Sequence, residues 1–135
     1  MAHRQGYRDL KVWQQAIDLV PQIYALVKTF PREEIYALSD QIRRAAVSVP
    51  ANIAEGPARL HSKEFLHHLA IARGSFAELD TLLIVAHRLG YLTTVDLDAI
   101  STSLLDVRMP LQGLINTPQR NGQRTTENGE PGLRA

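Results

Sequence analysis

The amino-acid sequence predicts an all-α protein, an antiparallel up-down four-helix bundle with proline-kinked helices. Apolar residues recur three and four positions apart over four long segments, as they do in helices that bury one face. Short connections rich in turn-forming and cap-forming residues separate these segments. Helices joined by such short connections pack as antiparallel neighbours, which favours an up-down bundle.

The first expected helix runs from about Asp9 to Thr29. Asp9 can cap its start, and Pro31 is expected to stop it at Phe30, because the residue before a proline avoids the helical conformation. Pro21 lies inside the segment and is expected to bend the helix or split it in two. The expected core row is Leu10, Trp13, Ile17, Val20, Tyr24 and Val27. A second apolar row beside it is Val12, Ala16, Leu19, Ile23 and Leu26.

The second expected helix begins near Ser39. Ser39 is a suitable N-cap, and Asp40 places a negative charge in the first turn, near the positive end of the helix dipole. The expected buried face is Ile42, Ala45, Ala46, Val49 and Ile53.

The stretch SVPANIAEG places Pro50 inside this second helix. Proline frees the carbonyl group of Ala46 and kinks the helix. Asn52 carries both donors and acceptors, so it can serve such a kink or the end of a facing helix. Small side chains around the kink allow another helix to come close, and Gly74-Ser75 of the third segment can provide the matching surface. We therefore predict that Pro50 and Asn52 are architectural residues and not catalytic ones.

A polar stripe beside the apolar face of the second helix is expected to specify one alignment of the bundle. Helical spacing places its members on one side. Arg44 is predicted to be at least partly buried and paired with Glu55 or with Glu78 of the next helix. The predicted structural polar seam is Arg44, Ser48, Asn52, Glu55 and Glu78.

The third expected helix runs from Ser62, an N-cap, to Leu89, with Gly90 as its stop. Its apolar positions follow an unbroken alternation of four-residue and three-residue steps, which is typical of a long helix in a bundle. The expected seam is Phe65, Leu69, Ala72, Phe76, Leu79, Leu83 and Ala86.

The fourth expected helix opens at Thr93, with Asp96 three residues later as in a capping box. Pro110 lies late in this segment and is the third proline, after Pro21 and Pro50, that is expected to kink a helix. The expected buried face is Leu97, Ile100, Leu104, Val107, Leu111 and Leu114.

A chain of 135 residues is long enough to form one domain with a core. We expect an N-terminal arm over residues 1–8, the helical bundle over residues 9–115 and a tail over residues 116–135. The tail is polar and rich in Gly and Pro, so it buries too little apolar surface to offset its ordering entropy. It is therefore predicted to be disordered.

The composition excludes several classes of protein. Because the chain has no cysteine, it has no disulfide, no thiolate chemistry and no cysteine-based zinc or iron–sulfur site. No apolar run approaches the roughly 20 residues that span a bilayer, and the start, MAHRQGYRDLKVW, lacks the apolar core of a secretory signal. We therefore expect a cytoplasmic protein with no membrane partner.

The apolar faces are wider than a single four-helix core requires. The first helix has its second row, and the third helix has another one beside its main seam. An apolar stripe of this width is buried either by deep packing or by another molecule, and we predict a stable homo-oligomer through these rows. The second row of the third helix is Ile71, Leu82, Val85 and Leu89.

The sequence offers no catalytic constellation and no complete metal site. Glu64 and His67 have the spacing of half a di-iron motif, but such a site needs two copies and two further carboxylates. Ser48, Ser62 and Ser75 are better explained as packing or capping residues than as nucleophiles. We therefore predict no metal, no cofactor and no enzymatic activity.

Basic residues are unevenly distributed. Residues 1–63 carry nine Lys and Arg against six Asp and Glu, whereas residues 64–115 carry three against six. Such a division suits contact between the two halves of the chain, an anionic partner, or solvated faces with no partner. The candidate phosphate-contacting residues are Arg43, Arg59, Lys63, Arg4, Arg8 and Lys11.

Four strings carry a family resemblance: YRDLKVWQQAIDLV, FPREEIYALSDQIRRAAVSVPANIAEGPAR, FLHHLAIARGSFAELDTLL and LGYL. Over about residues 7–115 the sequence resembles the 23S rRNA intervening-sequence protein family of bacterial four-helix-bundle proteins. The resemblance implies an antiparallel bundle that assembles into a ring, typically a pentamer, and it implies no enzymatic activity. A related branch, the accessory variability protein of diversity-generating retroelements, similarly forms a pentameric barrel whose basic surface engages a reverse transcriptase and nucleic acid.

These observations leave two functional hypotheses. The first is an oligomeric accessory protein, expected to be a pentamer, that binds nucleic acid such as structured RNA. The second is an oligomeric scaffold that recruits a partner protein through its rim or central channel. Neither the RNA nor the protein partner is specified by the sequence.

Overall fold

The computed structural model describes residues 6–56 and 62–117, and this part of the chain is entirely helical. Two short 3₁₀ helices, η1 (Gly6–Asp9) and η2 (Arg32–Glu34), accompany four α-helices. These are α1 (Lys11–Val27), α2 (Leu38–Glu55), α3 (Ser62–Arg88) and α4 (Thr94–Asn116). The predicted all-α class is confirmed. The expected tail lies outside the described residues from 118 onward, as do residues 1–5 of the expected arm.

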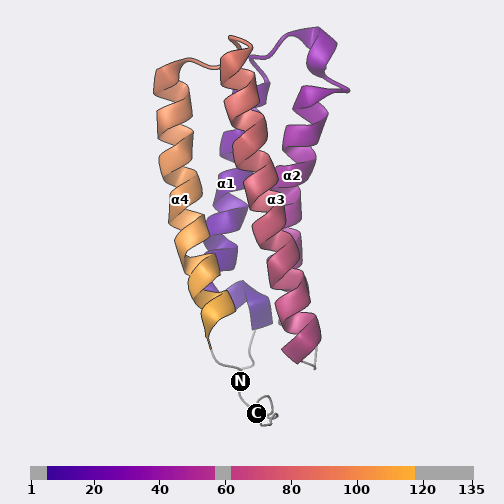
Figure 1. The fold of residues 1–135 in the computed structure, drawn as a ribbon, viewed down its shortest axis with the longest axis vertical. Coiled ribbons are helices and arrows are strands. Elements are labelled where there is room, and N and C mark those ends of the chain that lie inside the picture. Colours follow the sequence, from indigo (N-terminus) through magenta and orange to yellow (C-terminus); the bar gives the residue numbers. More distant parts are fainter. Residues whose placement is uncertain (1–5, 57–61, 118–135) are drawn as a thin grey trace.

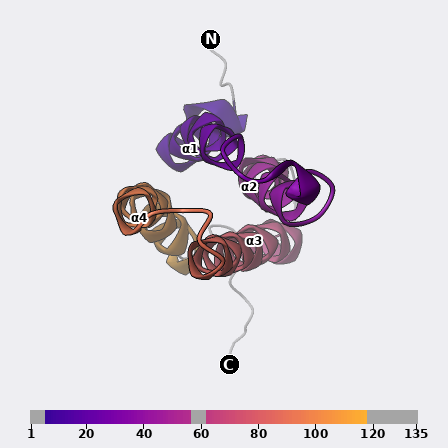
Figure 2. The same cartoon turned by 90° about the horizontal axis from the view of Figure 1, so that it is seen from above.

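The helices run alternately up and down and form a bundle (Figure 1). Seen from above, α1 packs on α2, α2 on α3, α3 on α4 and α4 on α1 (Figure 2). η1 and the starts of α1 and α3 lie at one end, which we call the η1 end. η2 and the connection between α3 and α4 lie at the other, which we call the η2 end (Figure 1). None of the described helices combines the length and apolarity that a membrane span requires.

The core consists of the inward faces of the four helices. The expected faces of α2 and α4 point inward, with Leu97 and Leu114 at the margin of the core. The expected seam of α3 is buried from Leu69 to Ala86, and Phe65 packs against the core as a partly buried residue. Regular apolar spacing was therefore sufficient to identify the buried faces of these three helices.

The rotation of α1 differs from the prediction. The residues that α1 buries come mostly from its expected second row, in which Ala16 and Ile23 are 0% exposed. In the expected core row, by contrast, Ile17 and Tyr24 are each 40% exposed. Apolar residues occupy 11 of the 17 positions of this helix, so spacing alone does not select the inward row. Packing against both neighbours decides the rotation, and the bond from Ser103 Oγ of α4 to Gln22 Oε1 of α1 (3.0 Å) fits it.

The N-terminal caps were predicted correctly for α4 but not for α1 and α2. Thr93 Oγ1 accepts a hydrogen bond from the Asp96 backbone N–H (3.0 Å), as expected. Asp9 belongs to η1 instead of capping α1, whose N-cap position is Leu10. Ser39 lies inside α2, where it is only 2% exposed.

A glutamate outside α2 supplies what Ser39 was expected to supply. Glu34 Oε1 accepts a hydrogen bond from the Leu38 backbone N–H at 3.3 Å. After the C-terminal end of α3, Gly90 adopts φ +85°, a left-handed conformation that glycine tolerates without strain. The predicted stop of α3 at Gly90 is confirmed, since α3 ends at Arg88.

Pro21, Pro50 and Pro110 all lie inside continuous helices. Pro21 therefore does not split α1, although the expectation of a bend at each proline stays a prediction. Pro50 is buried and faces the core side of α2, whereas Pro21 and Pro110 are exposed.

At the η2 end, one tyrosine connects the two inter-helix connections. Tyr91 Oη donates a hydrogen bond to Glu34 Oε2 (2.7 Å), and the rings of Phe30 and Tyr91 lie 5.4 Å apart. Glu34 thus accepts bonds from Tyr91 and from the first turn of α2. The hydrogen bond to the Glu34 carboxylate raises the pKa of Tyr91 above its ordinary value, with desolvation contributing in the same direction.

The predicted close approach of α2 to α3 occurs, but at a different glycine. A Cβ atom added at Gly56 would lie 3.2 Å from the Phe65 carbonyl oxygen and 3.3 Å from Leu69 Cδ2. Gly74, which was expected to provide the close surface, is exposed and has open space where a Cβ atom would lie. The correction follows from rotation, because Gly74 lies on the outer side of α3.

We expect Gly56→Ala and Gly74→Ala to change stability in opposite directions. The first inserts a methyl group against a backbone carbonyl and a core leucine and should cost about 1 kcal/mol. The second replaces an exposed mid-helix glycine and should add about 0.5–1 kcal/mol through helix propensity. Urea unfolding of both variants measures this difference, and equal shifts would contradict the close approach at Gly56.

The Tyr91–Glu34 bond should make part of the stability depend on alkaline pH. Because the folded-state pKa of Tyr91 is raised, its contribution is fully present below the unfolded-state pKa of about 10 and is lost as the pH rises through the folded value. The difference in unfolding free energy between the wild type and Tyr91→Phe should therefore shrink above that pH. An absorbance titration that compares the wild type with Tyr91→Phe should place the ionisation of Tyr91 above the ordinary tyrosine pKa of about 10. A constant difference in unfolding free energy across the alkaline range would refute this linkage.

Candidate nucleic-acid interface

Three of the predicted phosphate-contacting residues lie at the same end of the bundle, the η1 end, although Lys63 is on α3, diagonally across the bundle from α1 (Figure 2). Arg8 belongs to η1, Lys11 is the first residue of α1, and Lys63 is in the first turn of α3 (Figure 1). All three are exposed, and none forms an ion pair with another residue of the described part of the chain. The up-down topology produces this arrangement, because it brings the starts of α1 and α3 to the same end.

Arg43 does not belong to this group. It lies near the η2 end, where Nη2 donates a hydrogen bond to the Ile35 carbonyl oxygen (2.8 Å) and approaches Asp40 Oδ1 (3.9 Å). Its side chain is only 25% exposed. These contacts give Arg43 a structural role in holding the connection before α2. Arg4 and Arg59 lie outside the described residues.

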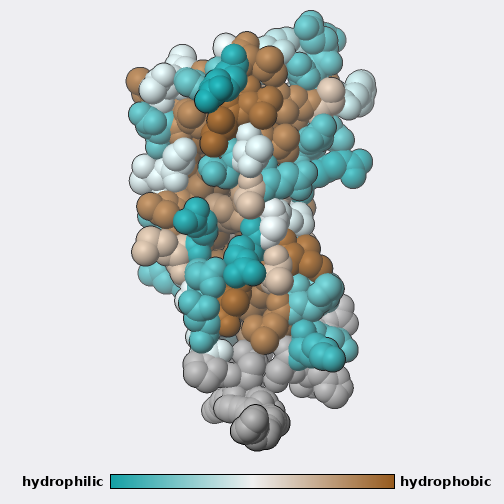
Figure 3. Space-filling model, viewed as in Figure 1, coloured by the Kyte–Doolittle hydropathy of each residue, from teal (hydrophilic) through white to brown (hydrophobic). Residues whose placement is uncertain are grey.

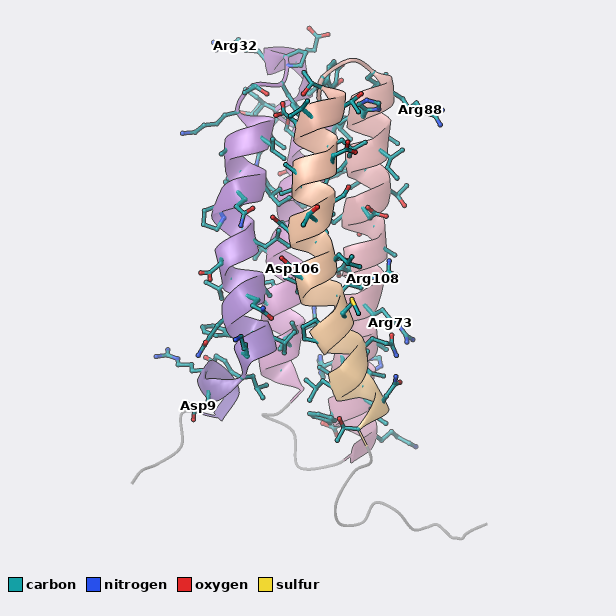
Figure 4. The ribbon with its side chains drawn as sticks, turned by 90° about the vertical axis from the view of Figure 1, so that its left-hand side faces the viewer. Asp9, Arg32, Arg73, Arg88, Asp106 and Arg108 are labelled. Carbon is teal, nitrogen blue, oxygen red and sulfur yellow. The ribbon has the colours of Figure 1, made fainter. Side chains whose placement is uncertain are left out.

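A second basic feature was missed by the sequence analysis. Arg73 of α3 and Arg108 of α4 line a groove of about 360 Å³ between these helices. Arg73 Nη1 donates a hydrogen bond to Gln112 Oε1 at 3.3 Å. Figure 4 shows both arginines on the α3 side of α4. Residues 64–115 carry a net negative charge, so the sequence did not indicate a basic surface there.

Polar side chains between α2 and α3 form a connected network. The hydroxyl oxygens of Ser48 and Ser75 are 2.7 Å apart. Asn52 Nδ2 donates to Ser48 Oγ (3.1 Å) and to the Ser48 carbonyl oxygen (3.0 Å). Asn52 Oδ1 lies 3.1 Å from His68 Nδ1. The Asn52 amide nitrogen faces Ser48, so the atom that faces His68 is the amide oxygen, which can only accept a hydrogen bond. His68 Nδ1 is therefore the donor and carries a proton.

This network replaces the predicted polar seam in part. Ser48 and Asn52 belong to it, but Arg44 does not. The Arg44 side chain is 79% exposed, and its Nε lies 2.8 Å from Asp40 Oδ2 of the same helix. The predicted burial of Arg44 and its pairing with Glu55 or Glu78 are therefore wrong; both glutamates are exposed. A carboxylate one turn away on the same helix is reached more easily than one on a neighbouring helix.

Of the two roles predicted for Asn52, the structure shows the contact with a facing helix and not the one at the proline kink. Its amide donates to the carbonyl of Ser48 and not to that of Ala46, which Pro50 was expected to leave free. Asn52 therefore connects α2 with α3 through His68 instead of repairing the proline site.

Two of the candidate serines and His87 have structural contacts. Ser48 and Ser75 bond to each other, and His87 Nε2 lies 3.1 Å from Thr94 Oγ1 at the start of α4. Glu64 and His67 are exposed in the first turns of α3. Within residues 6–56 and 62–117, no three His, Asp or Glu side chains gather where they could hold a metal ion.

Comparison with known proteins finds a matching protein family and similar solved structures. A family model described as 23S rRNA-intervening sequence protein matches residues 8–113. The fold is similar to the crystal structure of a protein of unknown function from the S23 ribosomal protein family of Bacteroides thetaiotaomicron, with a TM-score of 0.72 and 25% identity. That similarity covers 78% of this chain and 96% of the other. No curated protein matches the sequence.

We expect Asn52→Leu to destabilise the protein by about 1–3 kcal/mol, because it leaves His68 Nδ1 without its partner and removes one of the two hydrogen bonds of the Ser48 hydroxyl. Arg44→Ala is the matched control on the same helix and should cost less than about 1 kcal/mol, since the Arg44–Asp40 pair is exposed. Urea unfolding of the two variants checks the order. Comparable small effects would mean that the network contributes nothing to stability.

Proposed function

The chain belongs to the 23S rRNA-intervening sequence protein family, and from this membership we propose that it is a non-enzymatic, oligomeric accessory protein that binds structured RNA. The observation that carries the proposal is the group of exposed cations Arg8, Lys11 and Lys63 at the η1 end. Each is available to a phosphate, because no described carboxylate pairs with it.

Three cations per chain bind RNA weakly on their own, since each phosphate contact adds only one released counterion. Self-association would multiply the number of cations that contact one RNA molecule. Exposed apolar side chains support self-association, because an apolar surface of this kind is usually covered by another molecule. On α3, Ile71 is 37% exposed, Val85 39% and Leu89 54%. Figure 3 shows hydrophobic residues at the surface along α3 and α4, separated by hydrophilic ones.

A ring of parallel copies would gather the η1 ends on one rim. The cations of all subunits would then face the same ligand, and the phosphates of a folded RNA could contact several subunits at once. Affinity would depend on the phosphate backbone and the shape of the RNA more than on base sequence. The functional assignment therefore requires both the cations and the assembly.

The test compares charge reversal at the two ends of the bundle. Lys11→Glu/Lys63→Glu reverses the η1 end, and Arg32→Glu/Arg88→Glu reverses two exposed cations at the η2 end (Figure 4). We expect the η1-end variant to bind a 23S rRNA stem–loop at least about ten-fold more weakly and with a flatter dependence on salt. The η2-end variant should bind within about two-fold of the wild type.

Fluorescence anisotropy across a salt series, with a duplex DNA of equal length as a second ligand, measures these affinities. Equal losses in both variants would indicate non-specific charge attraction and would contradict an η1-end interface. No RNA binding by the wild type, together with nuclease-resistant capture of one host protein, would replace the proposal with the scaffold hypothesis.

A further inference from the structure

Two grooves of opposite charge flank α4. The acidic groove, between α1 and α4, has a volume of about 150 Å³ and includes Asp18 of α1 and Asp106 of α4. The basic groove, between α3 and α4, includes Arg73 and Arg108. Figure 4 shows Asp106 on the α1 side of α4, and Arg108 and Arg73 on its α3 side.

The acidic groove presents hydrogen-bond acceptors that lack donors. Gln15 Oε1 is buried and has no hydrogen-bond partner within the described residues. Neither Asp18 nor Asp106 forms an ion pair with a described residue. A buried unsatisfied acceptor beside two carboxylates is best satisfied by a group with several N–H donors. An arginine side chain has this chemistry.

The basic groove presents hydrogen-bond donors and positive charge instead. Gln112 Nε2 donates to Asn116 Oδ1 (2.9 Å), and Gln112 Oε1 accepts from Arg73 Nη1, so the Arg73 guanidinium is held by a short relay along α4. Asp80 also lines the groove, but it pairs with neither arginine. Two guanidinium groups in one groove without a bound carboxylate favour an anionic partner.

The two charged residues of α4 lie at nearly the same height, one in each groove. Asp106 and Arg108 are two residues apart on α4, which corresponds to a rise of about 3 Å along the helix. A closed ring forms when two different surfaces of one subunit meet on successive copies without net translation along the ring axis. Opposite charges at nearly one level on two sides of α4 are compatible with this condition.

We propose that the basic groove of one copy docks on the acidic groove of the next, with Arg108 pairing with Asp106 of the neighbouring copy. This inference rests on the self-association in the proposed function and names the surfaces that carry it. A two-fold contact through either groove would place like charges together, so the arrangement favours a head-to-tail ring. Leu105, 46% exposed, and Met109, 65% exposed, flank Arg108 in the sequence and would supply apolar contact area at this interface.

The test is a charge swap in the full chain. Asp106→Arg and Arg108→Asp should each raise the dissociation constant of the oligomer at least about ten-fold, because each places like charges across the interface. The double variant Asp106→Arg/Arg108→Asp restores opposite charges and should recover assembly. Asp98→Arg is the control, since Asp98 is an exposed carboxylate on α4 that lines neither groove.

Sedimentation velocity at micromolar concentration measures assembly, and circular dichroism confirms that each variant is helical. A monomeric wild type would overturn the self-association in the proposed function itself. If the wild type assembles and each single variant assembles equally well, only the groove-to-groove contact is overturned. Failure of the double variant to recover would refute the Arg108–Asp106 pairing. An Arg108→Asp protein that assembles normally but loses RNA affinity would assign the basic groove to phosphate binding instead.

Discussion

The close packing of α2 on α3 is the constraint on which the rest of the bundle depends. Along this contact, small residues let the two helices approach until a Cβ atom added at Gly56 would lie only 3.2 Å from the Phe65 carbonyl oxygen and 3.3 Å from Leu69 Cδ2. At such a distance the polar groups between the helices must be paired, and the Ser48–Ser75 and Asn52–His68 bonds pair them. The stretch SVPANIAEG is therefore a packing surface with one polar alignment, which answers why proline and small polar residues interrupt an apolar segment.

The η2 end adds a second constraint that fixes the helix pairs relative to each other. Glu34 accepts hydrogen bonds from the start of α2 and from Tyr91, which follows α3. One carboxylate thus aligns the two connections. At the η1 end, the exposed side chains include three cations, Arg8, Lys11 and Lys63.

The position of α4 decides which charged groups are available on the sides of the bundle. α4 packs on α1 through Ser103 and Gln22 and on α3 through Gln112 and Arg73, and a groove remains on each side. These grooves carry opposite charges although residues 64–115 are acidic in sum. Charge counted along the sequence averages over faces that point in different directions, so it identified neither groove.

Apolar spacing by itself determined the helical class, the four segments and the inward faces of α2, α3 and α4, because each has one dominant apolar stripe. It also located the Thr93 cap and the Gly90 stop, which depend on local backbone geometry alone. Only the tertiary structure decided the rotation of α1, the exposure of Arg44, the partners of Asn52 and the separation of Arg43 from Arg8, Lys11 and Lys63. These features depend on which side chains of other helices lie within hydrogen-bonding or packing distance, and residue spacing within one helix carries no information about those distances.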